Sequence, residues 1–348
     1  MILLDAFRHK ATSCAALDSP FMARLLTLLA DHWPLDTAIA RKFASFGGDI
    51  GPAGHSLPLR IAGGLHALVL TQRDAGLMAV YPPHTPDDVA LRDAVLAALV
   101  THSDFLLDWV ESPPQTNEVR RSAALIAGAR VAVAQFPLPL YLSELGASGG
   151  LNLMWDHYAL DVGGKRYGPD VPVLSLSPEW RGPAPLKSEP RIASRKGVDL
   201  NPLDPQRRDH LLHLTAYLWP DQPQRLSLTR AAASVMTAQI DRGDAIDWLG
   251  TRLSAAPQKH LHLIQHSVAW QYFPHDVQAR GTAMIEAAGK RATPERPLAW
   301  LAMESGGDTT GGVGAAVTLR MWPDDITLML GRADFHGRWI EWQHDATA

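Results

Sequence analysis

The chain has 348 residues, 46% of them hydrophobic and 20% charged, a composition typical of a globular protein with about two domains. The 32 lysines and arginines are nearly balanced by 36 aspartates and glutamates, which argues against a dedicated nucleic-acid-binding protein. Cys14 is the only cysteine, which excludes an internal disulfide and a cysteine-rich zinc site. No run of about 18 apolar residues predicts a membrane span, and residues 1–10 lack the pattern of a signal peptide, so we expect a cytoplasmic protein.

Residues 1–135 are predicted to form an all-helical cap domain. Ser19 followed by Pro20 is typical of a helix start, and Thr85-Pro86-Asp87-Asp88 repeats this pattern with acids in the first turn. Pro113-Pro114 ends the helical stretch that follows, and another helix is expected over residues 117–135.

Residues 136–348 are predicted to form an α/β domain, because short apolar runs alternate with helical stretches. The expected strands cover residues 140–145, 191–199, 259–265, 298–303, 315–321, 326–330 and 338–342. This alternation predicts a mostly parallel sheet. The last strands leave no room for helices between them, so the C-terminal edge is expected to be antiparallel. The Gly/Pro-rich segment at about 156–190 is interpreted as an insertion.

A glycine-rich turn follows the first predicted strand. The strand carries Glu144, the turn is Gly146-Ala147-Ser148-Gly149-Gly150, and Asn152 lies in the helix start beyond it. Glycines allow a positive φ and let a ligand approach the backbone closely, and a helix N-terminus can receive a carboxylate or phosphate. The turn contains no lysine or arginine, which counts against a triphosphate. It is therefore either a ligand-binding turn or a structural corner between strand and helix.

The same residues match the pattern G-x-S-x-G, which marks the nucleophile of serine hydrolases. In that interpretation Ser148 attacks the substrate, and an acid and a histidine follow along the chain. The candidate acids are Asp199 and Asp244, and the candidate bases are His266, His275 and His336. Glu144 has no role in a hydrolase.

Two further acids favour a nucleoside ligand. Asp199 ends the second predicted strand, where a carboxylate can accept hydrogen bonds from ribose hydroxyls. It lies further beyond Gly150 than the usual separation of about 20 residues, and the insertion accounts for the excess. Asp244 and Ala245 end a third strand–helix unit, where an aspartate can accept from an adenine amino group. A helix cap is the alternative role for either aspartate.

Glu144-Leu-Gly-Ala-Ser-Gly-Gly, Asp199 and Gly243-Asp244-Ala245 resemble, in this order, the ligand motifs of class I S-adenosylmethionine-dependent methyltransferases. The resemblance implies a Rossmann-like sheet, with S-adenosylmethionine held by Glu144, the turn, Asn152, Asp199, Asp244 and Ala245. The whole chain also resembles a bacterial family known only as a domain of unknown function, in blocks at 115–122, 146–156, 197–204, 219–222 and 266–272. In the first block, Asn117, Glu118, Arg120 and Arg121 are interpreted either as a roof over the cleft or as a solvated, ion-paired face.

Aromatic residues follow the predicted strand 259–265, at the edge where substrates enter such sheets. His266 is a candidate cofactor contact and general base, and Tyr272 is a second candidate catalytic residue. Trp270 could stack on adenine or attract the sulfonium by a cation–π contact, whereas core packing is the alternative for both aromatic residues. His260, His262 and His266 are not expected to hold a metal, since no carboxylate lies at ligand spacing.

The sequence thus predicts an S-adenosylmethionine-dependent transferase acting on a small molecule, with neither nucleic acid nor membrane as partner. Two alternatives stay open at this point: a serine hydrolase using Ser148, and a non-catalytic ligand-binding protein with the same fold. The substrate and the oligomeric state are not predicted.

Overall fold

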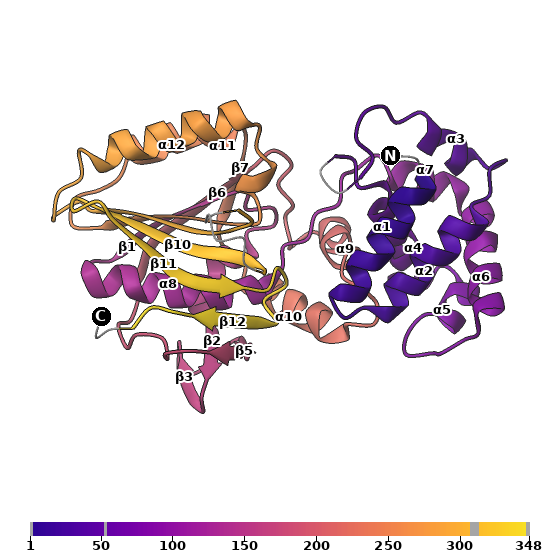
Figure 1. Cartoon of the computed structure of the whole chain (residues 1–348), viewed down its shortest axis with the longest axis horizontal. Coiled ribbons are helices and arrows are strands. Elements are labelled where there is room, and N and C mark those ends of the chain that lie inside the picture. The colour runs from indigo at the N-terminus through magenta and orange to yellow at the C-terminus, as the bar shows by residue number, and fades with distance from the viewer. Residues whose placement is uncertain (1–2, 52–53, 307–312, 346–348) are drawn as a thin grey trace. The chain divides into compact units, whose positions relative to one another are not determined.

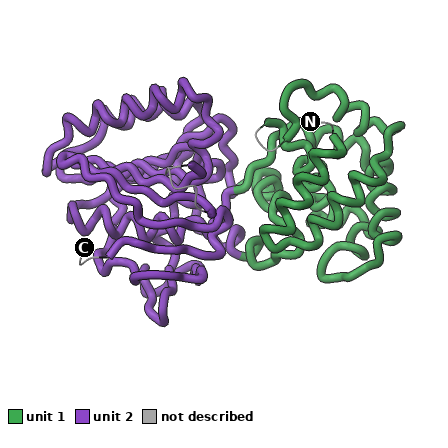
Figure 2. Tube along the Cα trace, in the orientation of Figure 1, with its two compact units in different colours: residues 1–116, 207–227 green, residues 117–206, 228–348 purple. Residues whose placement is uncertain are grey.

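The computed structural model describes residues 3–51, 54–306 and 313–345. Figure 2 shows two compact units, unit 1 (residues 1–116 and 207–227) and unit 2 (residues 117–206 and 228–348). The expected boundary between residues 135 and 136 lies elsewhere, because α8 (Ser122–Gln135) packs on strands of the sheet in unit 2. No helix within these described ranges is both long and apolar enough to cross a membrane.

Unit 1 is helical, and its first segment, residues 1–116, lies within the predicted helical domain (residues 1–135). Its helices are α1 (Leu3–Ala16), α2 (Pro20–His32), α3 (Ala38–Ala44), α4 (Leu57–Leu70), α5 (Ala75–Val80), α6 (Asp88–Thr101), α7 (Ser103–Trp109), α9 (Arg208–Ala216) and the start of α10 (Pro223–Ser234). Side chains cap their N-termini where the sequence indicates: Ser19 accepts from the Met22 amide and Asp87 from the Ala90 amide.

The segment 207–227 belongs to unit 1 because polar contacts bind it to the α1–α2 turn. The Asp221 carboxylate accepts from Ser19 Oγ at 2.6 Å and from the Phe21 amide at 2.9 Å. Gln222 Nε2 donates to the carbonyl oxygens of Leu17 and Asp18 at 3.1 and 3.0 Å. The sequence block at 219–222 therefore has a structural role.

Unit 2 is built around a nine-stranded sheet in the order β5-β12-β11-β10-β9-β8-β1-β6-β7 (Figure 1). Its strands are β1 (Leu140–Leu145), β5 (Glu179–Arg181), β6 (Ile192–Asp199), β7 (Gln239–Arg242), β8 (Leu261–Ser267), β9 (Leu298–Glu304), β10 (Ala315–Trp322), β11 (Ile326–Ala333) and β12 (Trp339–Trp342). The insertion forms a second, three-stranded sheet from β2 (Tyr158–Val162), β3 (Lys165–Tyr167) and β4 (Leu174–Leu176).

The expected mostly parallel sheet with antiparallel C-terminal strands is confirmed. Strands β7, β6, β1, β8 and β9 run parallel, and β9 to β12 form an antiparallel meander. The short β5, which comes from the insertion, adds a parallel pair at the outer edge. Strand order reverses at β1, and in open α/β sheets ligands bind beside the carboxyl ends of the strands at such a reversal.

Helices cover both faces of this sheet (Figure 1). On one face α8 packs against β8, β9 and β10, and η1 (Val119–Arg121) and η2 (Leu151–His157) lie against α8. On the other are α11 (Ala245–Ser254) and α12 (His275–Gly289). Glu144 and Gln265 are register neighbours on β1 and β8, so their side chains share a face, and His266 points to the opposite one.

Candidate functional site

The glycine turn follows β1 at the carboxyl edge of the sheet, and its backbone needs glycine. Gly146 has φ +66° and Gly150 has φ +72°. A Cβ added at Gly146 would lie 2.6 Å from the Cβ of Ala269, so even alanine would overlap with the loop after β8. Ser148 also has a positive φ, +54°, which is uncommon for a residue with a side chain.

Four backbone amides of the turn donate to groups of the protein itself. Each has its own acceptor: Ala147 donates to Val198 O (3.0 Å), Ser148 to Asp199 Oδ2 (2.8 Å), Gly150 to Ala147 O (2.7 Å) and Leu151 to Asn117 Oδ1 (2.7 Å). A phosphate cradle requires such amides to point at the ligand. These four are occupied, so they do not form one.

Asp199 and Asp244 both bind local backbone. Asp199 accepts from the Ser148 amide and, through Oδ1, from the Asn201 amide at 2.8 Å. Asp244 is the N-cap of α11, which begins at Ala245: its Oδ1 accepts from the amides of residues 246 and 247, both at 3.0 Å, and from Arg280. The expected contacts of these aspartates with ribose and adenine stay predictions.

Glu144 is a buried carboxyl with one oxygen left over. The residue is 2% exposed, and Oε2 has no hydrogen-bond partner among the residues that the structure describes. Burial raises the pKa of Glu144 to about 8, and the charge of Asp199 adds to the increase. A hydrogen bond with Gln265 and the positive charge of Arg121 oppose it.

The orientation of Gln265 is fixed by a buried chain of hydrogen bonds. Trp155 Nε1 donates to Gln265 Oε1 at 3.0 Å, and Gln265 Nε2 donates to Asn152 O at 3.1 Å. Asn152 in turn accepts from Ser122 Oγ at 2.8 Å. An indole N–H can only donate, so the amide oxygen of Gln265 faces Trp155 and its NH₂ group is the donor to Glu144. Asn152 thus contributes to the expected site through its backbone carbonyl oxygen, which accepts from Gln265.

Sequence reasoning missed both Gln265 and Trp155. A signal existed for the first, because Gln265 is a polar residue at the end of a predicted strand, directly after Leu263 and Ile264. Trp155 follows the turn in an apolar stretch and carries no comparable mark.

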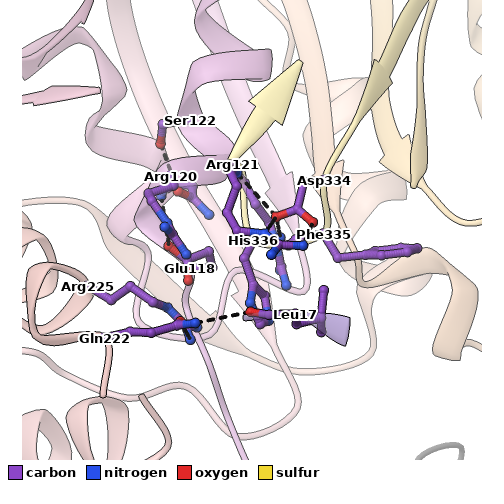
Figure 3. Close-up of polar contacts among 12 residues, drawn as sticks. Leu17, Glu118, Arg120, Arg121, Ser122, Gln222, Arg225, Asp334, Phe335 and His336 are labelled. Atoms are coloured by element: carbon purple, nitrogen blue, oxygen red, sulfur yellow. Dashed lines mark hydrogen bonds and ion pairs between the residues drawn. The ribbon is translucent and has the colours of Figure 1, made fainter. Parts of the chain in front are cut away.

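Arg121 comes from the block interpreted as a roof or a solvated face, and it is buried. The residue is 8% exposed, and its Nε and Nη1 donate to Phe335 O at 2.8 Å and Ser267 O at 3.2 Å. Figure 3 shows the side chain directed from η1 toward the turn that carries Asp334 and Phe335. Its charge acts on Glu144, so Arg121 belongs to the electrostatic surroundings of the candidate site.

His266 is engaged through both ring nitrogens. Trp300 Nε1 donates to its Nε2 at 2.8 Å, so Nδ1 carries the proton and donates to Glu304 at 2.7 Å. The histidine is 1% exposed and lies on the face opposite Glu144. In this arrangement neither nitrogen is available to take a proton from a substrate, and its expected role as a general base stays a prediction.

Glu304 organises the loop after β8. Its Oε1 also accepts from the amides of Ala269 and Trp270 at 3.0 and 3.1 Å. Burial raises the pKa of Glu304, but the hydrogen bonds that it accepts from His266 and from the backbone amides outweigh this effect, so the net shift is downward. Sequence reasoning missed Glu304 although, like Glu144 and Asp199, it is an acid at a strand end.

The aromatic residues of this loop differ in their surroundings. Trp270 stacks on His266 with ring centroids 5.1 Å apart and contacts Trp300 and Phe273, which is the packing alternative to a ligand contact. Tyr272 is 59% exposed. Among the other histidines, the buried His262 is bonded to Ser143 Oγ at 2.9 Å.

Ser148 meets one condition of a nucleophile elbow, the strained turn between strand and helix. Ser148 is 9% exposed, and its Oγ has no hydrogen-bond partner within residues 3–51, 54–306 and 313–345, so no imidazole in these ranges lies in position to activate it. A nucleophilic serine needs a base within about 2.6–3.2 Å.

The comparisons with known proteins identify the family. Residues 4–342 match the family model described as "Uncharacterized protein conserved in bacteria (DUF2332)", and the chain belongs to this family. Neither the curated proteins nor the solved structures contain a match.

Proposed function

We propose that this member of the family binds S-adenosylmethionine at the carboxyl ends of β1, β6 and β7, and transfers its methyl group to a small molecule. The proposal includes a Rossmann-like, methyltransferase-type fold for unit 2. The order of the parallel strands, β7-β6-β1-β8-β9, supports it, because the reversal at β1 is where such sheets bind nucleotides.

One observation carries the proposal: the backbone amides at the turn already donate to the protein itself, whereas one carboxyl oxygen beside the turn accepts no hydrogen bond from the described residues. The four amides at 147, 148, 150 and 151 have acceptors, whereas Glu144 Oε2 has no partner among the described residues. S-adenosylmethionine carries a sulfonium and an ammonium, both positive. A site with a spare carboxyl oxygen and occupied amides suits such a ligand better than a phosphate.

The donor set fits the rest of the cofactor. A carboxylate has about four acceptor positions, so Asp199 can accept from ribose while it holds the Ser148 amide. The side chain of Asp244 is 40% exposed, so adenine can approach it. When bound, the cofactor would supply an activated methyl group. Tyr272 is the candidate residue to meet the methyl acceptor, since it is exposed in the loop after β8.

Isothermal titration calorimetry with S-adenosylmethionine and its demethylated product tests the proposal. We expect the wild type and Glu295→Gln, an exposed acid-to-amide control, to bind both compounds. Asp199→Asn should weaken binding about tenfold or more, because a charged acceptor at the ribose is worth about 1.4 kcal/mol or more. Folded wild-type protein that gives neither heat nor a thermal shift with either compound refutes the proposal.

A serine hydrolase is the second candidate, supported by the positive φ of Ser148 in a turn between strand and helix. Labelling by a fluorophosphonate probe separates the two candidates. Under the methyltransferase proposal the wild type stays unlabelled. Labelling that Ser148→Ala abolishes would favour the hydrolase instead.

A further inference from the structure

We propose that Glu144 holds a proton in the free protein and releases it when the positively charged part of the ligand binds beside its second carboxyl oxygen. The inference rests on the proposed function, and it adds a proton exchange to the binding step. It starts from the geometry of the Glu144 carboxyl, of whose two oxygens Oε2 lacks a hydrogen-bond partner among the described residues.

The hydrogen bonds around Glu144 suit a neutral acid. Gln265, held by Trp155, donates to the carboxyl, and in the described part of the chain Oε2 has no partner although the residue is only 2% exposed. A buried carboxylate needs several donors or a close counter-charge, because transfer of an isolated charge out of water is costly. One neutral amide donor does not meet that need.

The charged groups that face Glu144 also leave it without a dedicated counter-ion. They are Arg121 from η1, Asp199 from β6 and, as a titratable neighbour, Tyr158 from β2. Two guanidinium nitrogens of Arg121 already donate to carbonyl oxygens, and the negative Asp199 opposes a second negative charge nearby. A pKa of about 8 for Glu144 agrees with this balance.

A ligand cation changes the balance. Its charge replaces the missing counter-ion, and a sulfonium or ammonium next to a carboxylate favours the ionised form. The O–H bond of Glu144 then breaks, its electron pair stays on the carboxylate, and the proton passes to the buffer. Binding of S-adenosylmethionine at about neutral pH should therefore release close to one proton.

The resting proton can be tested without any ligand. Infrared spectra of the wild type minus Glu144→Gln should contain the C=O stretch of a protonated carboxylic acid at neutral pH, and the band should disappear as the pH rises through about 8. Wild type minus Glu295→Gln should lack this band. If Glu144→Gln does not fold, the titration of the band in the wild type alone decides. A wild type without such a band refutes the inference.

The exchange is tested by calorimetry at about neutral pH in two buffers with different ionisation enthalpies. We expect close to one proton released when S-adenosylmethionine binds the wild type, and none with Glu144→Gln. The demethylated product keeps the ammonium and lacks the sulfonium, so comparing the two ligands shows which cation Glu144 responds to. Binding without proton release refutes the exchange but leaves the proposed function standing. Absence of binding refutes both the proposed function and the proton exchange. In that case the infrared band still shows whether Glu144 is protonated in the ligand-free protein.

Discussion

Glu144→Gln is expected to remove a large part of the pH dependence of the stability of unit 2. In the folded protein the pKa of Glu144 is raised from 4.5 to about 8, chiefly by burial. The folded state then binds the proton more tightly than the unfolded state. The stabilisation is fully present below the unfolded pKa and is lost as the pH rises through the folded pKa. Between about pH 5 and about pH 8 this loss amounts to about 3.5 kcal/mol. Glutamine does not titrate, so the variant lacks this loss.

Hydrogen exchange of the β1 amides reports the opening of the structure around Glu144 specifically, which matters in a protein with two compact units. After correction for the intrinsic exchange rates, the opening free energy of the wild type should fall by about 3.5 kcal/mol relative to Glu144→Gln over that pH range. Glu295→Gln, the exposed control, should follow the wild type. If wild type and Glu144→Gln give parallel curves, the buried carboxyl does not hold its proton as we infer.

Three substitutions test local packing and hydrogen bonding. Asp221→Asn should lower the free energy of unfolding of unit 1, measured in urea, by about 1–3 kcal/mol, because two donors of the α1–α2 turn lose a charged acceptor. The exposed control Asp209→Asn should have little effect. Equal effects of the two substitutions would contradict this reasoning. Gly146→Ala should lower the melting temperature more than Gly163→Ala, since both glycines have a positive φ but only the first substitution adds a clash. Equal decreases in melting temperature would show that the positive φ accounts for the whole effect and that the clash adds nothing. Asn117→Ala should speed exchange of the amide that begins η2 by about tenfold or more, and unchanged exchange would show that this amide has another acceptor.

The sequence predicts the sheet well because its strands are distinct in composition. Residues 140–145 are mostly apolar apart from Ser143 and Glu144, and β1 has those bounds and is buried along its whole length, which is typical of a central parallel strand. The domain boundary was harder to place. Residues 122–133 are buried on all sides of α8, so their pattern indicates a buried helix without showing which unit it packs in.

The candidate site could be predicted only in part, because strand-end acids have two uses with the same residue types. Asp199 and Asp244 lie where the sequence places them, yet both accept from nearby backbone amides, as short acids often do at turns and helix starts. The bond between Trp155 and Gln265 joins residues 110 positions apart, and no local pattern indicates it. Glu304 could have been found, because it lies directly after the predicted strand 298–303, and Glu144 and Asp199 likewise lie at strand ends.

The contacts of Ser148 and His266 agree better with the proposed transfer of an already activated methyl group than with hydrolysis by Ser148. In hydrolysis by Ser148, a base must take the hydroxyl proton, but Ser148 Oγ has no partner in the part of the chain that the structure describes, and both nitrogens of His266 are engaged. A methyl group on a sulfonium is attacked without prior activation by the protein, so binding and orientation of the two reactants supply much of the rate. Close packing at Gly146 fixes the turn against the loop held by Glu304, which agrees with the orienting role that the proposed function gives them. Under the proposed function, such a site needs a fixed backbone surface and a carboxyl group that can face the ligand cation more than it needs a free base. The carboxyl edge of the sheet at β1 and β8 is the candidate for both the surface and the carboxyl group.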